Sequence, residues 1–277
     1  MSEKKIVGAA KIMEDLFEKG IYAEKMKAKY RMDLIRKEII NSFPKDCKRL
    51  VLNDNVSACY QIKKKYEVDY VGLNEYLANL GFLTADYANI VKKDEIIKEI
   101  SPFEKPSERY IKMYPKKSAK PELQPLDYSS YLLEQLAFFW EQTNIEFKHY
   151  ESLEKGAKRQ MFLCEELKKE KMVCSYGSVN YANKPAQYDL NAISKEYGID
   201  FLIEHAKVTS DGIDQLIKKD VLSKKEVSKF KKEVDREVVF VVTQLKSEER
   251  SLQMLNNKNV IRLQNQQDRV KISQSAI

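Results

Sequence analysis

The chain has 277 residues, of which 43% are apolar and 33% charged, with only 8 glycines and 7 prolines and a net charge of +7. A charged fraction above the roughly 25% of an average domain, with few turn-forming residues, predicts a mainly α, α+β protein. No stretch approaches the ~18 apolar residues of a membrane span, and the charged N-terminus lacks the apolar region of a signal peptide. We therefore expect a cytoplasmic protein that does not enter a membrane.

Residues 1–101 are predicted to form an N-terminal part that begins with a long helix over 9–42. β-branched and aromatic residues on both sides of Asp54 then favour two strands joined by a turn. Asp69 is placed to cap a short helix that ends at Gly81, because Asp accepts backbone hydrogen bonds at helix starts and Gly is typical just after helix ends.

Residues 102–126 hold five of the seven prolines and are predicted to be an extended, basic connector. Lys116 and Lys117 lie in this segment with Tyr110 and Tyr114 nearby. Lysines interleaved with aromatic residues can contact phosphates and stack on unpaired bases, so the two lysines are candidate nucleic-acid contacts.

Residues 127–250 are predicted to begin with a second long helix over 127–171, which would measure about 67 Å if straight. Its apolar stripe is wide enough to pack against one or two other helices, in a coiled coil or a bundle. The partner is the first long helix, from the same chain or from another protomer, and a homodimer is expected. The candidate interface residues are Leu136, Phe139, Trp140, Phe147, Tyr150, Leu153, Met161 and Leu167.

A small head is predicted to follow the second helix. Val173–Tyr181 surrounds Gly177 as a hairpin does, and Asp189 is placed to cap a helix that ends at Gly198. This order of long helix, strand pair and capped helix is also predicted in the N-terminal part. An internal repeat and chance similarity of amphipathic helices both explain the likeness.

The segment from 216 to 236 contains the densest basic cluster of the chain. Ser223 and Glu226 are spaced as a capping box within it, and Asp211 is the expected cap of the preceding helix. Residues 236–245 form the best predicted strand, and 251–277 a polar tail. Lysines near phosphates release counterions and so provide affinity that is independent of sequence. The candidate contacts are Lys218, Lys219, Lys224, Lys225, Lys229, Lys231 and Lys232. A solvated surface is the alternative interpretation.

The motifs of the common enzyme classes are absent from the sequence. There is no glycine-rich phosphate loop, no GxSxG and no HExxH, and the two histidines have no ligand spacing. The four cysteines form no CxxC pair, which does not favour zinc. We expect no enzyme activity, no cofactor and no metal.

The second half of the chain resembles Gam-like coiled-coil proteins of bacteriophages. The resemblance covers 127–232 and rests on the long charged helix, "YGSVNY", "KPAQYDLNAISKEYG" and "SDGIDQLIKKDVLS". The family has a helical stalk with a small β-plus-helix head, and its members bind DNA ends or block host nucleases as dimers. Asp220 stands where the family has a glycine, and the N-terminal part is additional.

Two functions follow as hypotheses. The first is a non-enzymatic, phage-type accessory protein that binds DNA or the machinery acting on it, for DNA protection or inhibition of a nuclease or defence factor. The second is an interaction or scaffold protein that binds a host protein partner without touching nucleic acid.

Overall fold

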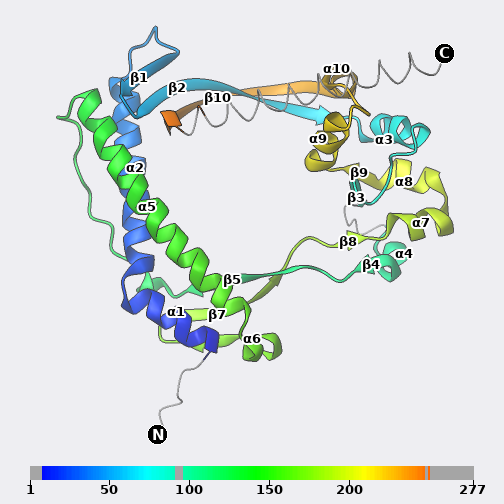
Figure 1. The fold of residues 1–277 in the computed structure, drawn as a ribbon, viewed down its shortest axis with the longest axis horizontal. Coiled ribbons are helices and arrows are strands. Elements are labelled where there is room, and N and C mark those ends of the chain that lie inside the picture. Colours follow the sequence, from blue (N-terminus) through cyan, green and yellow to red (C-terminus); the bar gives the residue numbers. More distant parts are fainter. Residues whose placement is uncertain (1–7, 91–95, 247–248, 250–277) are drawn as a thin grey trace, which may run out of the picture. The chain divides into compact units, whose positions relative to one another are not determined.

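The computed structural model describes residues 8–90, 96–246 and 249, and its helices and strands confirm the α+β class (Figure 1). The chain divides into two compact units. Within the described residues, unit 1 comprises 8–61, 108–184 and 240–246, and unit 2 comprises 62–90, 96–107, 185–239 and 249. No helix in these ranges is long and apolar enough to cross a membrane.

The two units differ from the predicted division at 102–126, because each takes elements from both halves of the chain. The unit boundaries fall inside β2 (Val56–Val68) and β10 (Lys231–Gln244), which are neighbours in one sheet. The predicted connector contains β5 (Arg109–Pro115), which pairs antiparallel with β7 (Gly177–Asn183). β5 is an edge strand that ends on a proline, so its proline is compatible with the sheet.

Both predicted long helices are interrupted in unit 1. The first consists of α1 (Gly8–Glu18) and α2 (Ile21–Ser42), separated at Gly20, whose φ of 71° is left-handed. The second consists of α5 (Leu133–Phe162) and α6 (Glu165–Lys169). The 30 residues of α5 measure about 45 Å rather than the predicted 67 Å. α2 and α5 pack along one another (Figure 1).

The strands of unit 1 belong to two sheets. β1 (Arg49–Asn53) pairs with β2 in the order β1-β2-β10, and β6 (Met172–Cys174) pairs with β7 in the order β5-β7-β6. Both predicted hairpins are thereby confirmed, since β1–β2 and β6–β7 are antiparallel neighbours. A 3₁₀ turn, η2 (Lys117–Ala119), follows β5.

Two apolar clusters hold unit 1 together. In one, the C-terminal half of α2 and the first turns of α5 cover the β1–β2 hairpin. This cluster includes Ile35, Ile39, Phe43, Leu52, Val56, Ala58, Leu136, Ala137, Trp140 and Phe240. In the other, α1, α6 and the end of α5 cover the β6–β7 hairpin. It includes Ala9, Ala10, Met13, Leu16, Ile111, Met161, Leu167, Cys174 and Val179.

One buried carboxylate joins α2 to α5. Glu154, only 6% exposed, accepts a hydrogen bond from Lys25 of α2 and forms an ion pair with Lys158, whose Nζ lies 2.7 Å from its Oε1. Burial alone would raise the pKa of Glu154, but the hydrogen bonds from Lys158 and Lys25 outweigh it and leave the pKa below its ordinary value.

Glu154→Gln is expected to lower the free energy of unfolding by about 2 kcal/mol at pH 7, because it leaves two partly buried lysines without their counter-charge. A carboxylate whose pKa is lowered in the folded state stabilises above its unfolded pKa, and that contribution is lost as pH falls through the folded pKa. Urea denaturation at neutral pH and near pH 3 tests this, and the deficit of the variant should shrink in acid. Glu151→Gln, which removes an exposed pair with Lys155, should change stability by less than about 0.5 kcal/mol at either pH.

Unit 2 is built from short elements. In chain order after the end of β2 they are α3 (Tyr70–Asn79), β3 (Ala88–Ile90), α4 (Ile97–Ile100), η1 (Ser101–Phe103), β4 (Glu104–Lys105), β8 (Gln187–Tyr188), α7 (Leu190–Tyr197), α8 (Ile199–His205), β9 (Ala206–Val208), α9 (Ser210–Lys218), α10 (Lys224–Lys229) and the first part of β10. β3 pairs antiparallel with β9, and β4 with β8.

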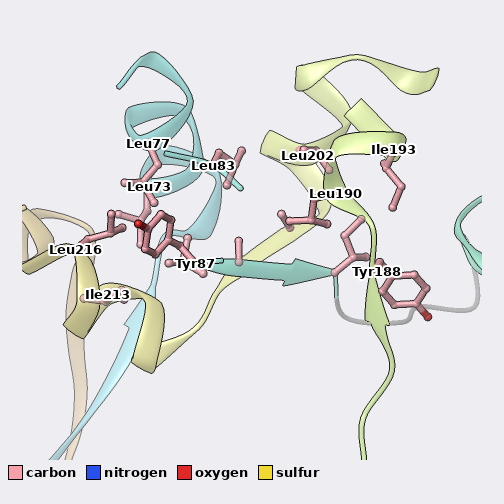
Figure 2. Close-up of a cluster of buried hydrophobic side chains, with 14 of the residues drawn as sticks. Leu73, Leu77, Leu83, Tyr87, Tyr188, Leu190, Ile193, Leu202, Ile213 and Leu216 are labelled. Carbon is pink, nitrogen blue, oxygen red and sulfur yellow. The ribbon is translucent and has the colours of Figure 1, made fainter. Parts of the chain in front are cut away.

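The core of unit 2 lies where α3, α7, α8 and α9 meet these strands. Figure 2 shows part of it, with Leu73 of α3 and Leu216 of α9 beside Tyr87. One buried amide crosses this core, since the Asn74 side chain donates to the carbonyl oxygens of Ile203 and Ala206 at 3.0 and 2.7 Å. These bonds tie α3 to the end of α8 and the start of β9.

Most predicted caps of unit 2 are present. Asp69 accepts from the backbone N–H of Gly72, Asp189 caps α7, and Ser223 with Glu226 forms the capping box of α10. The cap of α9 is Thr209 rather than Asp211, because the Thr209 hydroxyl accepts from Gly212 N at 2.9 Å. The predicted tail, 251–277, lies outside the described residues.

Candidate nucleic-acid interface

The lysines predicted between 218 and 232 all lie in unit 2, on three successive elements. Lys218 ends α9 and Lys219 follows it, Lys224, Lys225 and Lys229 belong to α10, and Lys231 and Lys232 begin β10 instead of continuing a helix. Lys219 is engaged within the fold, since its Nζ lies 2.7 Å from the Tyr87 hydroxyl. That hydrogen bond raises the pKa of Lys219. Lys218, Lys224, Lys225, Lys229 and Lys232 are exposed.

Lys116 and Lys117 lie in unit 1, at the end of β5 and in η2. Lys116 Nζ donates to the carbonyl oxygen of Ser175 at 2.9 Å, in the turn of the β6–β7 hairpin. The predicted contacts therefore belong to two different units.

The strand pair that leads into α10 carries basic residues that sequence reasoning missed. We define the first ribbon as residues 62–68 of β2 and 231–239 of β10, all in unit 2. Its end is closed by a hydrogen bond from Asp69 N to Phe230 O at 2.9 Å. Residues 60–67 of β2 and 234–238 of β10 are exposed without alternation, so neither face of the ribbon is packed on a core.

Cations outnumber carboxylates on the first ribbon, six to four, and three of them are consecutive: Lys63, Lys64 and Lys65. Lys64 pairs with Glu233 at 2.8 Å and Lys65 with Asp235 at 3.0 Å across the two strands. Hydrogen bonds from Arg236 and Lys64 lower the pKa of Glu233, which therefore stays ionised. These pairs fix the side chains, while strand alternation places Lys63 on the same face as Lys65.

Exposed apolar and aromatic side chains accompany the lysines. Tyr66 is 47% exposed, Val234 is 53% exposed and Val238 is 63% exposed. A two-stranded ribbon has the dimensions to enter the major groove of a duplex, and lysines along its edges can reach phosphates. The run IKKKYEV carried the signal for this surface, because a strand with lysine at consecutive positions has no apolar face to bury.

The predicted oligomer interface requires a correction. Leu136, Trp140, Met161 and Leu167 are at most 7% exposed and belong to the clusters of unit 1 itself. Phe139 packs against the same core, while Phe147 and Tyr150 are half-buried and Leu153 is exposed. The four buried residues are covered by α1, α2 and the strands of unit 1 and so stabilise the fold of the single chain, whereas Leu153 stays exposed.

Within the described ranges, no group of three or more His, Cys, Asp or Glu side chains is placed to hold a metal ion. A pocket of about 260 Å³ in unit 2 has Asp86, Asp211 and Lys105 in its lining. All three are exposed, so the pocket does not hold a charged group away from water. It therefore gives no catalytic assignment.

Comparison with known proteins returns no relative, since no family model, no curated protein and no solved structure matches the chain.

Proposed function

We propose that the protein binds duplex nucleic acid through the first ribbon and the adjacent lysines of α10, without catalysing a reaction. The observation that carries the proposal is that both faces of the first ribbon are exposed and bear Lys63, Lys64 and Lys65. An exposed strand pair with this charge buries little apolar surface and therefore contributes little to the stability of the fold. Its lysines can instead contact phosphates and gain affinity from counterion release.

The expected affinity is modest and depends on salt. Each phosphate contact contributes about −0.9 to the slope of log K against log salt, so four to six contacts give a slope of about −4 to −5. Binding that does not read base edges has a Kd of roughly 10⁻⁴ to 10⁻⁶ M at physiological salt. Lys64 and Lys65 contribute less to phosphate binding than free lysines would, because each is already paired with a carboxylate, Glu233 or Asp235.

Neutralising three exposed lysines tests the proposal. Lys63→Gln with Lys224→Gln and Lys225→Gln is expected to weaken binding at least tenfold at low salt and to reduce the slope by about 3. Fluorescence anisotropy of a labelled 20-base-pair DNA duplex, titrated at several salt concentrations, measures both quantities.

The matched control removes the same charge elsewhere. Lys37, Lys45 and Lys48 are exposed lysines of unit 1. Their triple Gln variant should bind nearly as the wild type does, because net charge alone does not locate the contact. Equal losses in both triple variants would contradict a local interface, and a wild type that does not bind at low salt would refute the proposal.

The resemblance of 127–232 to Gam-like proteins adds a finer proposal, that the bound duplex end is shielded from nucleases. Digestion of a blunt-ended duplex by an exonuclease, with and without the protein, measures this shielding. The variant of Lys63, Lys224 and Lys225 should restore digestion, and the control variant should not.

The exposed valines of the first ribbon favour a second candidate function. Val234 and Val238 could contact a protein partner, as expected for a scaffold that binds a host protein without nucleic acid. That function predicts no duplex binding by the wild type. It also predicts a partner whose binding survives loss of Lys63 but not a change of Val234→Asp.

The expected homodimer and coiled coil rested on the stripe of α5. Half of the eight residues assigned to it are buried within unit 1, so the stripe no longer requires a second copy. Phe138, Ile145 and Leu153 are exposed apolar residues of α5 that a second copy could cover. Light scattering over a range of concentrations distinguishes a dimer from the 32.4 kDa monomer.

A further inference from the structure

The two three-stranded sheets of the protein are built in the same way. In each, a hairpin follows a long helix, and its second strand leads into an Asp-capped helix: β1–β2 then α3, and β6–β7 then α7. In each, a third strand from the other half of the chain pairs with that second strand, giving the orders β1-β2-β10 and β6-β7-β5: β10 comes after its hairpin in the chain and β5 before its own. The same strand order could arise twice by chance, but residues at matching positions of the two sheets also make the same contacts.

The first matched contact joins the long helix to its hairpin. Phe43, just after α2, packs edge-on against Tyr60 with ring centroids 5.5 Å apart and an interplanar angle of 85°. Phe162, the last residue of α5, packs against Tyr181 at 5.3 Å and 89°. Tyr60 and Tyr181 are each the fifth residue of the second hairpin strand. Thus the same pair of residue types holds the same two elements in both places.

The second matched contact closes each sheet at the hairpin turn. Asn55 directly precedes β2, and its carbonyl oxygen accepts from Leu245 N, just after the third strand β10, at 2.9 Å. Tyr176 directly precedes β7, and its carbonyl oxygen accepts from Lys116 N, just after the third strand β5, also at 2.9 Å. The two third strands therefore have the same register against the two hairpins.

This common register also places the same kind of residue in the core. Phe240 and Ile111 lie five residues before Leu245 and Lys116 respectively, and each is the buried residue of its third strand. Phe240 joins the cluster over the β1–β2 hairpin and Ile111 the cluster over the β6–β7 hairpin. The two apolar clusters of unit 1 are therefore counterparts.

In unit 2, the residues that cap α3 and α7 also make matching contacts. Asp69 donates its backbone N–H to Phe230 O, directly before β10, at 2.9 Å. Asp189 donates its backbone N–H to Phe103 O, directly before β4 and on the way to β5, also at 2.9 Å. Both Asp side chains then cap the following helix, α3 or α7.

A tyrosine of each capped helix completes the matched set. Tyr76 of α3 packs against Phe230, and its hydroxyl donates to Glu226, four residues before that Phe. Tyr197 of α7 packs against Phe103, and its hydroxyl donates to the backbone carbonyl of Glu99, again four residues before the Phe. No short local motif produces this set of contacts twice.

We infer that residues 21–116 and 133–245 are two copies of one structural unit, and that the strand pair β5–β7, which corresponds to β2–β10, is a second site for the nucleic-acid duplex. The copies contact each other through α2 with α5 in unit 1, through β3 with β9 in unit 2, and through the strand pairs β2–β10 and β5–β7, in which each copy adds its last strand to the other copy's hairpin. The inference rests on the proposed function for its ligand, and on the matched contacts for the location of the site.

The strand pair β5–β7, the second ribbon, buries Ile111 and Val179 on one face and carries basic and aromatic side chains on the other. In unit 1, Tyr110, Lys112 and Tyr114 of β5 alternate onto one exposed face, with Lys112 Nζ 5.1 Å from the Tyr114 ring centroid. Arg109 is also exposed. Lys184 and Glu108, which directly flank β7 and β5, form an ion pair at 2.6 Å, and the first ribbon likewise has a cross-strand pair, Lys64 with Glu233.

The test compares one neutralised pair at each site with the combined variant. Arg109→Gln with Lys112→Gln should weaken binding to the 20-base-pair duplex about fivefold to tenfold and reduce the salt slope by about 2. Lys63→Gln with Lys224→Gln should do the same at the first site, which consists of the first ribbon and the adjacent α10. In the combined variant the salt slope should fall by the sum of the two single-site reductions, because independent phosphate contacts contribute additively to it.

The outcomes separate this inference from the proposed function. If the Arg109 and Lys112 variant binds as the wild type does while the Lys63 and Lys224 variant is weakened, the second site is refuted and the proposed function stands. If the wild type does not bind at low salt, the proposed function fails and the second site with it. Circular dichroism of each variant confirms that the fold is intact, as expected for exposed positions.

Discussion

Gly212→Ala is expected to destabilise unit 2 by about 4 kcal/mol, an effect far above that of an ordinary surface change. A Cβ at this position would lie 2.2 Å from the carbonyl oxygen of Tyr87 and 2.7 Å from its Cα. Both are backbone atoms, so no side-chain rotation relieves the clash. The start of α9 would have to move away from the segment that enters β3, and the core around Tyr87 would open.

Thermal unfolding followed by circular dichroism measures this loss as a lower melting temperature. The matched control is Gly156→Ala in α5, where an added Cβ meets nothing within 4 Å. Because Ala is the better helix former, this control should stabilise the protein by up to about 1 kcal/mol. A Gly212→Ala variant that melts with the wild type would show that α9 does not approach Tyr87 so closely.

Leu136→Ala is expected to lower the free energy of unfolding by about 3 kcal/mol. Leu136 is completely buried among α2, α5 and the β1–β2 hairpin, and its truncation leaves a cavity that rigid neighbours cannot fill. Trp140, the single tryptophan of the chain, lies in the same cluster, so its fluorescence reports the unfolding of this core during urea denaturation.

The control for Leu136 is Leu163→Ala, because Leu163 is 77% exposed and its truncation removes little packing. Protein concentration provides a second check. An interface between two copies makes the unfolding midpoint depend on concentration, whereas a core within one chain does not. If the unfolding midpoint of the Leu136→Ala variant rises with protein concentration, Leu136 belongs to an interface between two copies.

Local features of this fold could be predicted from sequence, since neighbouring residues decide them. Asp69, Asp189 and the pair Ser223–Glu226 cap helices because their side chains reach backbone groups three residues away at most. Gly20 shows the limit of the same approach. The apolar pattern continues across it, so the break between α1 and α2 was hidden by the periodicity on both sides.

Long-range pairing could not be predicted. β5 pairs with a strand about seventy residues later, and nothing in the Pro-rich segment 102–126 specifies that partner. The candidate site was affected in the same way. Lys231 and Lys232 were found as a charge cluster, but their association with Lys63–Lys65 depends on the pairing of β2 with β10. Which strand pairs with β2 or β7 is decided by the folded chain and cannot be read from a short stretch of sequence.

The interleaving of the two units has a consequence for folding during synthesis. The cluster that includes Ile35 and Ile39 also needs Phe240, which the ribosome adds some two hundred residues later. A nascent chain therefore lacks this member of the cluster, and the strand that pairs with β2, for most of its translation. Such topologies fold slowly and depend on chaperones while the missing strand is still being made, so expression at low temperature or with added chaperones should raise the soluble yield.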